Sequence, residues 1–317
     1  MNLHAPVLLH EVADAISPMS DGTYADFTFG RGGYSAEWLR RAPCTIYALD
    51  RDPDAIAAGQ ELASTHAGLN MVPGRFGDAM ELLGATNAPP LDGIAMDLGV
   101  SSPQLDEAAR GFSFQADGPL DMRMSRSGPT AADLVNNEGE EALANVIYRL
   151  GEERLSRRIA KAIVARRADK PFTTTLDLAD CVTGAMPGSA RRQKIHPATR
   201  TFQALRLAVN DELGELERGL IAAEHLLAPG GRLAVVSFHS LEDRITKLFL
   251  RDRSGGVGQS RHMPDVAPEQ AATFKLVKRG AIKAGAEEIA ANPRARSARL
   301  RVAIRTDAPA WPVQEVA

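Results

Sequence analysis

Glycines and an acid near the N-terminus are spaced so that they can hold a nucleoside. Gly30, Gly32 and Gly33 follow an apolar, β-like run, and Asp50 ends the next such run, 20 residues beyond Gly30. A glycine turn between a strand and a helix exposes backbone N–H groups, and a carboxylate ending the second strand can accept hydrogen bonds from both ribose hydroxyls. The pattern predicts a nucleoside-containing cofactor. The alternative is that the glycines make only a turn and Asp50 only caps a helix.

The turn sequence indicates which nucleoside cofactor is bound. The segment from Gly30 to Tyr34 reads G-R-G-G-Y, without the third glycine of the dinucleotide fingerprint. S-Adenosylmethionine carries no phosphate, so the backbone of Gly32, Gly33 and Tyr34 need only accommodate its carboxylate. Asp26 is the acid that commonly opens the methyltransferase version of this turn, although Thr28 stands where many such enzymes have another glycine. We therefore expect S-adenosylmethionine, with a nicotinamide-dependent oxidoreductase as the rival interpretation.

Phe76 and Asp78 follow the third β-like run, where a methyltransferase of this type holds the adenine. Phe76 could pack on the adenine ring and Asp78 could accept from its amino group. A core phenylalanine and a helix-capping aspartate are equally good interpretations of the two residues.

The fourth β-like run ends in D-L-G-V-S-S-P-Q, from Asp97 to Gln104, at the edge where an open α/β sheet places its ligands. Methylation of a ring-conjugated amine requires acceptors that hold its N–H groups and align its lone pair with the sulfonium. Ser101 and Ser102 are the candidate catalytic acceptors, and Asp97 and Gln104 are expected to contact the cofactor.

A fifth β-like run ends in S-F-H-S-L-E-D, which brings Phe238 and His239 to the same edge. The two rings could flank a base that is splayed out of an RNA strand, so His239 joins the catalytic candidates. The alternative is that Ser240 caps the following helix while Phe238 lies in the core.

The elements that must position these residues alternate between strands and helices. Apolar runs at 23–29, 45–50, 69–72 and 91–98 are separated by helical patterns, which is typical of a parallel sheet in an α/β fold. No strand is expected from about 105 to 207, where apolar residues recur at helical spacing. The alternation resumes with a helix at 213–227 and a strand at 232–238. We expect a Rossmann-like core formed by 1–105 and 208–317, interrupted by a helical domain at 106–207.

Composition excludes several classes of protein. The chain of 317 residues has a net charge of −3, so bulk charge does not drive nucleic-acid binding, but basic residues concentrate in the helical insert. Two cysteines and seven histidines show no metal-ligand spacing, and we expect no metal site. No apolar stretch approaches a membrane span, so the protein is expected to be soluble and cytoplasmic. The candidate phosphate contacts in the insert, against the alternative of an ordinary solvated face, are Arg191, Arg192, Lys194 and Arg200.

Several longer strings resemble one bacterial family. They include H-A-P-V-L-L at His4, F-G-R-G-G at Phe29, D-L-G-V-S-S-P-Q-L-D at Asp97, H-P-A-T-R-T-F-Q-A-L-R at His196 and S-F-H-S-L-E-D-R at Ser237. The family is that of the 16S ribosomal RNA cytosine-N4 methyltransferases, known as RsmH or MraW, and the resemblance covers almost the whole chain.

The resemblance implies a class I methyltransferase core with a helical insert, acting on a decoding-centre cytidine within 16S rRNA of the small ribosomal subunit. Carried over position by position, the family's cofactor contacts are Gly32, Gly33, Tyr34, Asp50, Phe76, Asp97 and Gln104. Tyr34 departs from the family, in which histidine is usual, and this puts a side-chain role there in doubt. The rivals that remain are a non-enzymatic RNA-binding or ribosome-assembly factor and a related enzyme acting on DNA or protein. Oligomeric state is left open.

Overall fold

A computed structural model describes residues 6–188, 195–255 and 270–313. The chain forms two compact units, which divide between Gly99 and Val100 and again between Glu212 and Leu213. The expected boundaries were 105/106 and 207/208, a few residues inside these. We call the unit that contains both chain ends the sheet unit, and the unit from Val100 to Glu212 the helical unit. No helix in the described ranges combines the length and the hydropathy that crossing a membrane requires.

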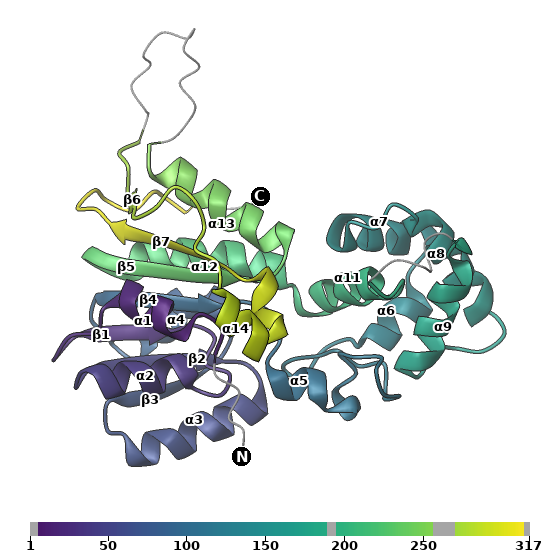
Figure 1. Cartoon of the computed structure of the whole chain (residues 1–317), viewed down its shortest axis with the longest axis horizontal. Coiled ribbons are helices and arrows are strands. Elements are labelled where there is room, and N and C mark those ends of the chain that lie inside the picture. The colour runs from purple at the N-terminus through teal and green to yellow at the C-terminus, as the bar shows by residue number, and fades with distance from the viewer. Residues whose placement is uncertain (1–5, 189–194, 256–269, 314–317) are drawn as a thin grey trace, which may run out of the picture. The chain divides into compact units, whose positions relative to one another are not determined.

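The sheet unit is built on seven strands in the order β3-β2-β1-β4-β5-β7-β6 (Figure 1). β1 to β5 run parallel, and β7 pairs antiparallel with both β5 and β6. This confirms the expected Rossmann-like class I methyltransferase core. The strands are β1 (Thr23–Asp26), β2 (Thr45–Asp50), β3 (Leu69–Pro73), β4 (Leu91–Asp97), β5 (Leu227–Ser237), β6 (Phe274–Leu276) and β7 (Arg299–Arg305).

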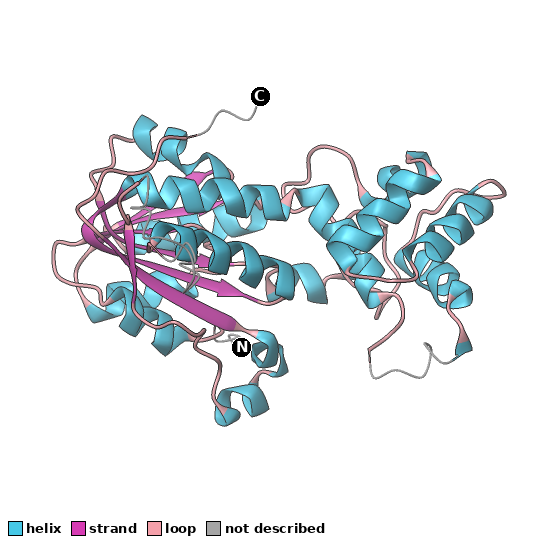
Figure 2. Cartoon of the chain, turned by 90° about the horizontal axis from the view of Figure 1, so that it is seen from above, coloured by secondary structure: helices cyan, strands magenta, loops and turns pink. Residues whose placement is uncertain are grey.

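Helices cover both faces of the sheet (Figure 2). Side chains of β4 alternate between two cores, with Ala95 on one face and Ile94 and Met96 on the other, as the two-residue period of a strand requires. The first core is covered by α1 (Leu9–Ile16), α2 (Gly33–Arg41), α3 (Pro53–Thr65) and α14 (Ala286–Ala291), with η3 (Pro293–Ser297). The second core is covered by α4 (Ala79–Ala85), α12 (Glu212–Leu226) and α13 (Ser240–Arg253).

The helical unit packs its helices around a separate apolar core, in which Phe172, Leu143 and Ile159 are fully buried. The described part of this unit contains no strand, and a single bridge joins Pro119 to Thr174. Its elements are α5 (Ser102–Asp106), η2 (Ala108–Arg110), α6 (Ala131–Asn137), α7 (Glu140–Gly151), α8 (Ser156–Arg167), α9 (Thr175–Ala185) and α11 (Thr199–Asn210).

Candidate functional site

The glycine turn after β1 is joined to the acid that ends β2. The Gly30 N–H donates to Asp50 Oδ2 at 2.8 Å, and the Asp52 N–H donates to Asp50 Oδ1 at 2.8 Å. Burial raises the pKa of Asp50, while these N–H groups lower it. Each carboxylate oxygen keeps a second lone pair, because an ionised carboxylate accepts about four hydrogen bonds. Asp50 can therefore brace the turn and still accept from two hydroxyls.

Gly32 and Gly33 are required by the packing of the protein itself. Gly32 has φ +76°, and a Cβ there would lie 2.6 Å from the Phe29 ring. A Cβ on Gly33 would lie 2.0 Å from Cγ of Pro6, so the N-terminal segment passes directly over this turn. The space left by these two absent side chains is thus already filled, and the Gly32 N–H donates to the Phe29 carbonyl at 2.7 Å.

Tyr34 uses its side chain to fasten the N-terminal segment to α2. The ring is buried, and its hydroxyl donates to the Val7 carbonyl at 2.5 Å. Burial, reinforced by the charges of Asp97 and Asp26, raises the pKa of Tyr34 well above its ordinary value. The side chain that replaces the family's usual histidine therefore has a packing role. Any contact of Tyr34 with a ligand would come from its backbone.

Asp97, at the carboxyl end of β4, presents an unsatisfied acceptor. Its Oδ1 is buried and has no hydrogen-bond partner among the described residues. Burial raises the pKa of Asp97 well above its usual range, and the charges of Asp26 and Glu242 raise it further. The Asp97 backbone N–H donates to Thr28 Oγ1 at 2.6 Å, which ties the end of β4 to the loop after β1. A buried acceptor without a donor is costly, so this oxygen suits a cationic or N–H-bearing ligand.

Asp26, at the end of β1, adds a second buried acid to this edge. Burial raises its pKa to about 6, although the Ser35 hydroxyl, donating to Oδ2 at 2.8 Å, works in the opposite direction. The adjacent ends of β1 and β4 thus each carry a buried acid whose ionised form is disfavoured by burial. The sequence offered no signal for Thr28 and Ser35 as partners, because each contact depends on how neighbouring strands end.

Phe76 and Asp78 lie in η1 (Phe76–Asp78), after β3. The Phe76 ring packs against α12, where a Cβ on Gly219 would lie 2.5 Å from it, and its centroid is 6.4 Å from that of Phe27. One side of the half-buried ring is therefore part of the core. Asp78 is exposed and occupies the N-cap position of α4, as the capping alternative expected, but its side chain makes no capping hydrogen bond.

The loop after β5 is organised by Glu242. Its carboxylate accepts from the N–H groups of Phe238, at 2.8 Å, and His239, at 3.2 Å. His239 is the N-cap of α13: its Nδ1 faces the Glu242 N–H at 3.5 Å, and its Nε2 lies 3.0 Å from Glu242 Oε1 without hydrogen-bond geometry. The alternative drawn from the sequence made Ser240 the N-cap. Ser240 is instead the first residue of the helix, one position after the N-cap. Phe238 is half-buried against the core.

Ser101, Ser102 and Gln104 belong to the helical unit, whereas Asp97 belongs to the sheet unit. The Ser101 N–H donates to Gln104 Oε1 at 2.9 Å across the first turn of α5, and the Gln104 side chain is buried. The amide oxygen of Gln104 is thus engaged in capping its own helix. Both serines are partly exposed at the beginning of α5.

The basic residues of α7, α8 and the turn between them divide into two groups. Arg166 is bound to Asp177, and Arg167 donates to the carbonyls of Val135 and Glu138, so these two hold the fold together. A second group is exposed and makes no ion pair within the described ranges: Arg149, Arg154, Arg157, Arg158 and Lys161, with the exposed Tyr148 beside them in α7. We call this second group the basic face.

Of the four phosphate contacts expected from the sequence, one can be placed. Arg200 is exposed at the beginning of α11, and its Nη1 lies 3.8 Å from Glu153 Oε2. Arg191, Arg192 and Lys194 lie outside the described residues. Among the residues that are described, no group of three or more His, Cys, Asp or Glu side chains is arranged to hold a metal ion.

Comparison with known proteins finds one family along most of the chain. The family model described as "MraW methylase family" matches residues 1–306. A Ribosomal RNA small subunit methyltransferase H from Paramagnetospirillum magneticum is 58% identical over 311 residues, covering 97% of each chain. Proteins of the same name from Rhodospirillum centenum and Rhodospirillum rubrum are 58% and 54% identical, covering 98% of this chain and 94% and 96% of their own lengths.

Proposed function

Because the chain belongs to the MraW methylase family, we propose that it transfers a methyl group from S-adenosylmethionine to the N4 amine of a cytidine in the decoding centre of 16S rRNA. Support for the RNA comes from the relatives, which are named for the small ribosomal subunit. Support for S-adenosylmethionine as the methyl donor comes from the buried acids at the carboxyl ends of β1 and β4. The site of action is the cytoplasm, with the small subunit itself as partner.

The observation that carries the proposal is the unpartnered Oδ1 of Asp97 beside the buried Asp26. S-Adenosylmethionine brings an ammonium and a sulfonium, and a buried carboxylate oxygen without a donor is a fitting acceptor for the ammonium. Asp50 accepts from the ribose hydroxyls through its remaining lone pairs, and the backbone of Gly32, Gly33 and Tyr34 receives the amino-acid carboxylate at the beginning of α2. Exposed Asp78 and the open side of Phe76 hold the adenine, and Gln104 lies on the chain segment that follows Asp97.

The bound donor supplies an electrophilic methyl group, so the protein's task is to hold the acceptor amine in line with it. Ser101 and Ser102 accept from the amine N–H groups and turn its lone pair out of conjugation with the ring. His239 flanks the base, with its ring orientation fixed by Glu242. These residues position the target base and exclude water from it. The proposal requires no protein nucleophile and no metal.

The target base must leave any helix to be methylated, so the rest of the RNA needs its own binding surface. The basic face and Arg200 provide cations for phosphates, and Tyr148, with 58% of its surface exposed, provides a ring on which a base can stack.

Mass-spectrometric mapping of nucleosides tests the proposal directly. The protein and S-adenosylmethionine are incubated with 30S particles that lack the modification, and in parallel with naked 16S rRNA. We expect N4-methylcytidine at a single decoding-centre position in the rRNA of the 30S particles. Tight binding of particles without transfer would instead support an assembly factor, and binding of NAD in place of S-adenosylmethionine would support an oxidoreductase.

A further inference from the structure

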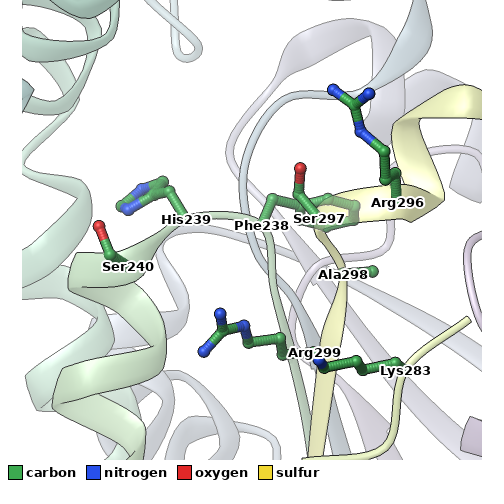
Figure 3. Close-up of a pocket in the computed structure, with 8 residues that line it drawn as sticks. All are labelled: Phe238, His239, Ser240, Lys283, Arg296, Ser297, Ala298 and Arg299. Atoms are coloured by element: carbon green, nitrogen blue, oxygen red, sulfur yellow. The ribbon is translucent and has the colours of Figure 1, made fainter.

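A small cavity opens beside the carboxyl end of β5, within the sheet unit. Its volume is about 250 Å³, and its wall comes from three places: the loop between β5 and α13, the segment before α14, and η3 with the first residue of β7 (Figure 3). The lining residues are Phe238, His239, Ser240, Lys283, Arg296, Ser297, Ala298 and Arg299. This volume lies below the range of about 300–1,000 Å³ typical of small-molecule pockets, so a single compact group fits better than a nucleotide.

The wall is strongly cationic. Lys283 and Arg296 are exposed and form no ion pair in the described part of the chain. Arg299, with 49% of its side chain exposed, has one guanidinium nitrogen 2.9 Å from Asp243 Oδ2. We call these three residues the cationic cradle.

Asp243 does not neutralise the cradle. Its other oxygen, Oδ1, is 2.8 Å from Nε of Arg301, so one carboxylate is shared between two arginines. Burial raises the pKa of Asp243, but the Arg301 and Arg299 guanidiniums outweigh it, and the pKa lies below its ordinary value. The other acid nearby, Glu242, is occupied by the N–H groups of Phe238 and His239. Both acids are thus engaged by other groups, and the exposed Lys283 and Arg296, without an ion pair in the described part of the chain, favour an anion.

Phosphate oxygens match the donors that line this cavity. A guanidinium offers a planar fork to two oxygens, an ammonium offers a compact charge, and the exposed Ser297 hydroxyl can donate as well. The 14-residue helix α13 begins at Ser240, and its N-terminal dipole favours negative charge in the same place.

The strand register places the cradle near the proposed methyl-transfer edge. Arg299 pairs with Ser237 on one side of β5, and Asp97 pairs with Val236 on the other. Two strand spacings, about 10 Å, therefore separate the backbone of Arg299 from the end of β4. Phe238 lies between them, since a Cβ on Gly99 would lie 3.7 Å from its ring. A phosphate in the cavity is thus within a nucleotide's reach of an amine presented at Asp97.

We propose that the cationic cradle of Lys283, Arg296 and Arg299 binds a phosphodiester of the RNA strand next to the target nucleotide, an inference that rests on the proposed function. The sheet unit then binds the RNA strand next to the reacting nucleotide, independently of the basic face of the helical unit. The cationic cradle fixes the position of the strand beside the target nucleotide, and His239, in the same cavity wall, flanks the target base.

Double variants that each remove two positive charges test the cationic cradle. In Lys283→Gln/Arg296→Gln, both exposed cations are removed while the ion pair of Arg299 with Asp243 is kept. The control, Lys247→Gln/Lys275→Gln, removes two exposed lysines of the sheet unit that do not line the cavity. The probe is a fluorescein-labelled single-stranded oligocytidylate of about 12 nucleotides, within the usual site size of such surfaces, and its anisotropy is followed over a salt series.

We expect the cradle pair to bind this RNA about 10-fold more weakly, with the slope of log K against log salt reduced by about 0.7 for each phosphate that the variant no longer neutralises. The control pair should change both quantities much less, and Lys283→Arg/Arg296→Lys should restore binding. Affinity for S-adenosylmethionine should be the same in all variants. Equal effects in the cradle and control pairs, or no weakening in the cradle pair, would overturn the proposal.

Methyl transfer to unmodified 30S particles separates this inference from the proposed function. The cradle pair should raise KM and leave kcat close to that of the wild type, because the two cations bind the RNA strand and do not touch the reacting atoms. If the wild type binds RNA through the cradle yet transfers no methyl group, the cradle is supported and the proposed function fails.

Discussion

Asp97 shows most directly how one residue can indicate a ligand. Its acceptor oxygen is buried without a donor, next to a second acid, and such an arrangement persists in a folded protein when function requires it. The sequence indicated this residue because it ends an apolar strand at the edge where α/β sheets bind ligands. The sequence did not reveal that Tyr34 would lie beside it, because that contact depends on the path of the N-terminal segment.

Asp97→Asn should weaken binding of S-adenosylmethionine by about 10- to 100-fold, the range expected when a hydrogen bond to a charged group is removed. The folded protein should not lose stability, because burial already disfavours the charged carboxylate. Calorimetric titration and thermal unfolding measure the two effects. Asp92→Asn is the matched control, since Asp92 lies at the opposite end of β4 and accepts from the Thr23 N–H. Equal affinities in the two variants would remove Asp97 from the site.

Asp26 gives the free energy of unfolding a defined pH dependence. Its pKa in the folded state, about 6, exceeds the ordinary value of 3.8, so the folded protein binds the proton more tightly than the unfolded chain does. Its contribution to stability is fully present below pH 3.8 and is lost as the pH rises through 6, a change of about 3 kcal/mol at most. Urea unfolding of Asp26→Asn at intervals across this range should show a flatter profile than the wild type. Identical profiles would mean that the carboxylate is not perturbed.

His239→Asn separates helix capping from contact with the base. Asparagine is a strong N-cap, so α13 and the stability of the fold should be retained. Loss of the ring should lower kcat/KM for 30S particles about 10-fold, because stacking on a base contributes about 1–3 kcal/mol. Full activity in this variant, with unchanged thermal unfolding, would assign His239 to capping alone.

Among the elements, β2 was predicted to the residue, because its apolar run is bounded by a proline-containing turn on one side and the Asp50-Arg51-Asp52-Pro53 turn on the other. β1 was expected to reach Phe29 but ends at Asp26. The chain beyond it still donates to neighbouring strands, from the Phe27 N–H to Ala95 and from the Phe29 N–H to Leu49. β5 begins at Leu227, earlier than expected, because its Gly/Pro segment is accommodated by an irregular register opposite β4. Local signals find strands well, but pairing decides where they end.

Gly33→Ala tests the close approach between α2 and the N-terminal segment. The added methyl group would overlap the Pro6 ring, so we expect a loss of about 1–3 kcal/mol in urea unfolding, with weaker cofactor binding as the turn shifts. Gly84→Ala in α4 is the control, since a Cβ there meets nothing within 4 Å and alanine favours a helix by up to about 1 kcal/mol. A Gly33→Ala protein as stable as this control would show that the segment can move aside.

At the scale of the whole molecule, the helical insert was predictable because a long stretch without strand signals interrupts a strand–helix alternation. The cationic cradle could not be predicted, because Lys283 and Arg299 are distant from the β5 loop in sequence. Arg299 reaches that loop through the antiparallel β7, and Lys283 follows Ile282, which forms a bridge with Leu300 of β7.

RNA affinity should also depend on the basic face of the helical unit. Arg157→Gln/Arg158→Gln removes two exposed cations from α8. Binding of 30S particles should weaken, and its salt dependence should become shallower, while S-adenosylmethionine affinity stays unchanged. An effect no larger than that of the Lys247→Gln/Lys275→Gln control would leave the basic face as an ordinary solvated surface.

The interruption of the sheet unit by the helical unit has a consequence for how the protein is made. β4 pairs with β5, yet more than one hundred residues are synthesised between Asp97 and Leu227. On a translating ribosome, the first four strands emerge before β5 has been synthesised, so one side of β4 is unpaired until then. Folding of the intervening helices shortens the span to be closed and so reduces its entropic cost. β4 can therefore gain its second neighbour only after the whole inserted unit has been synthesised.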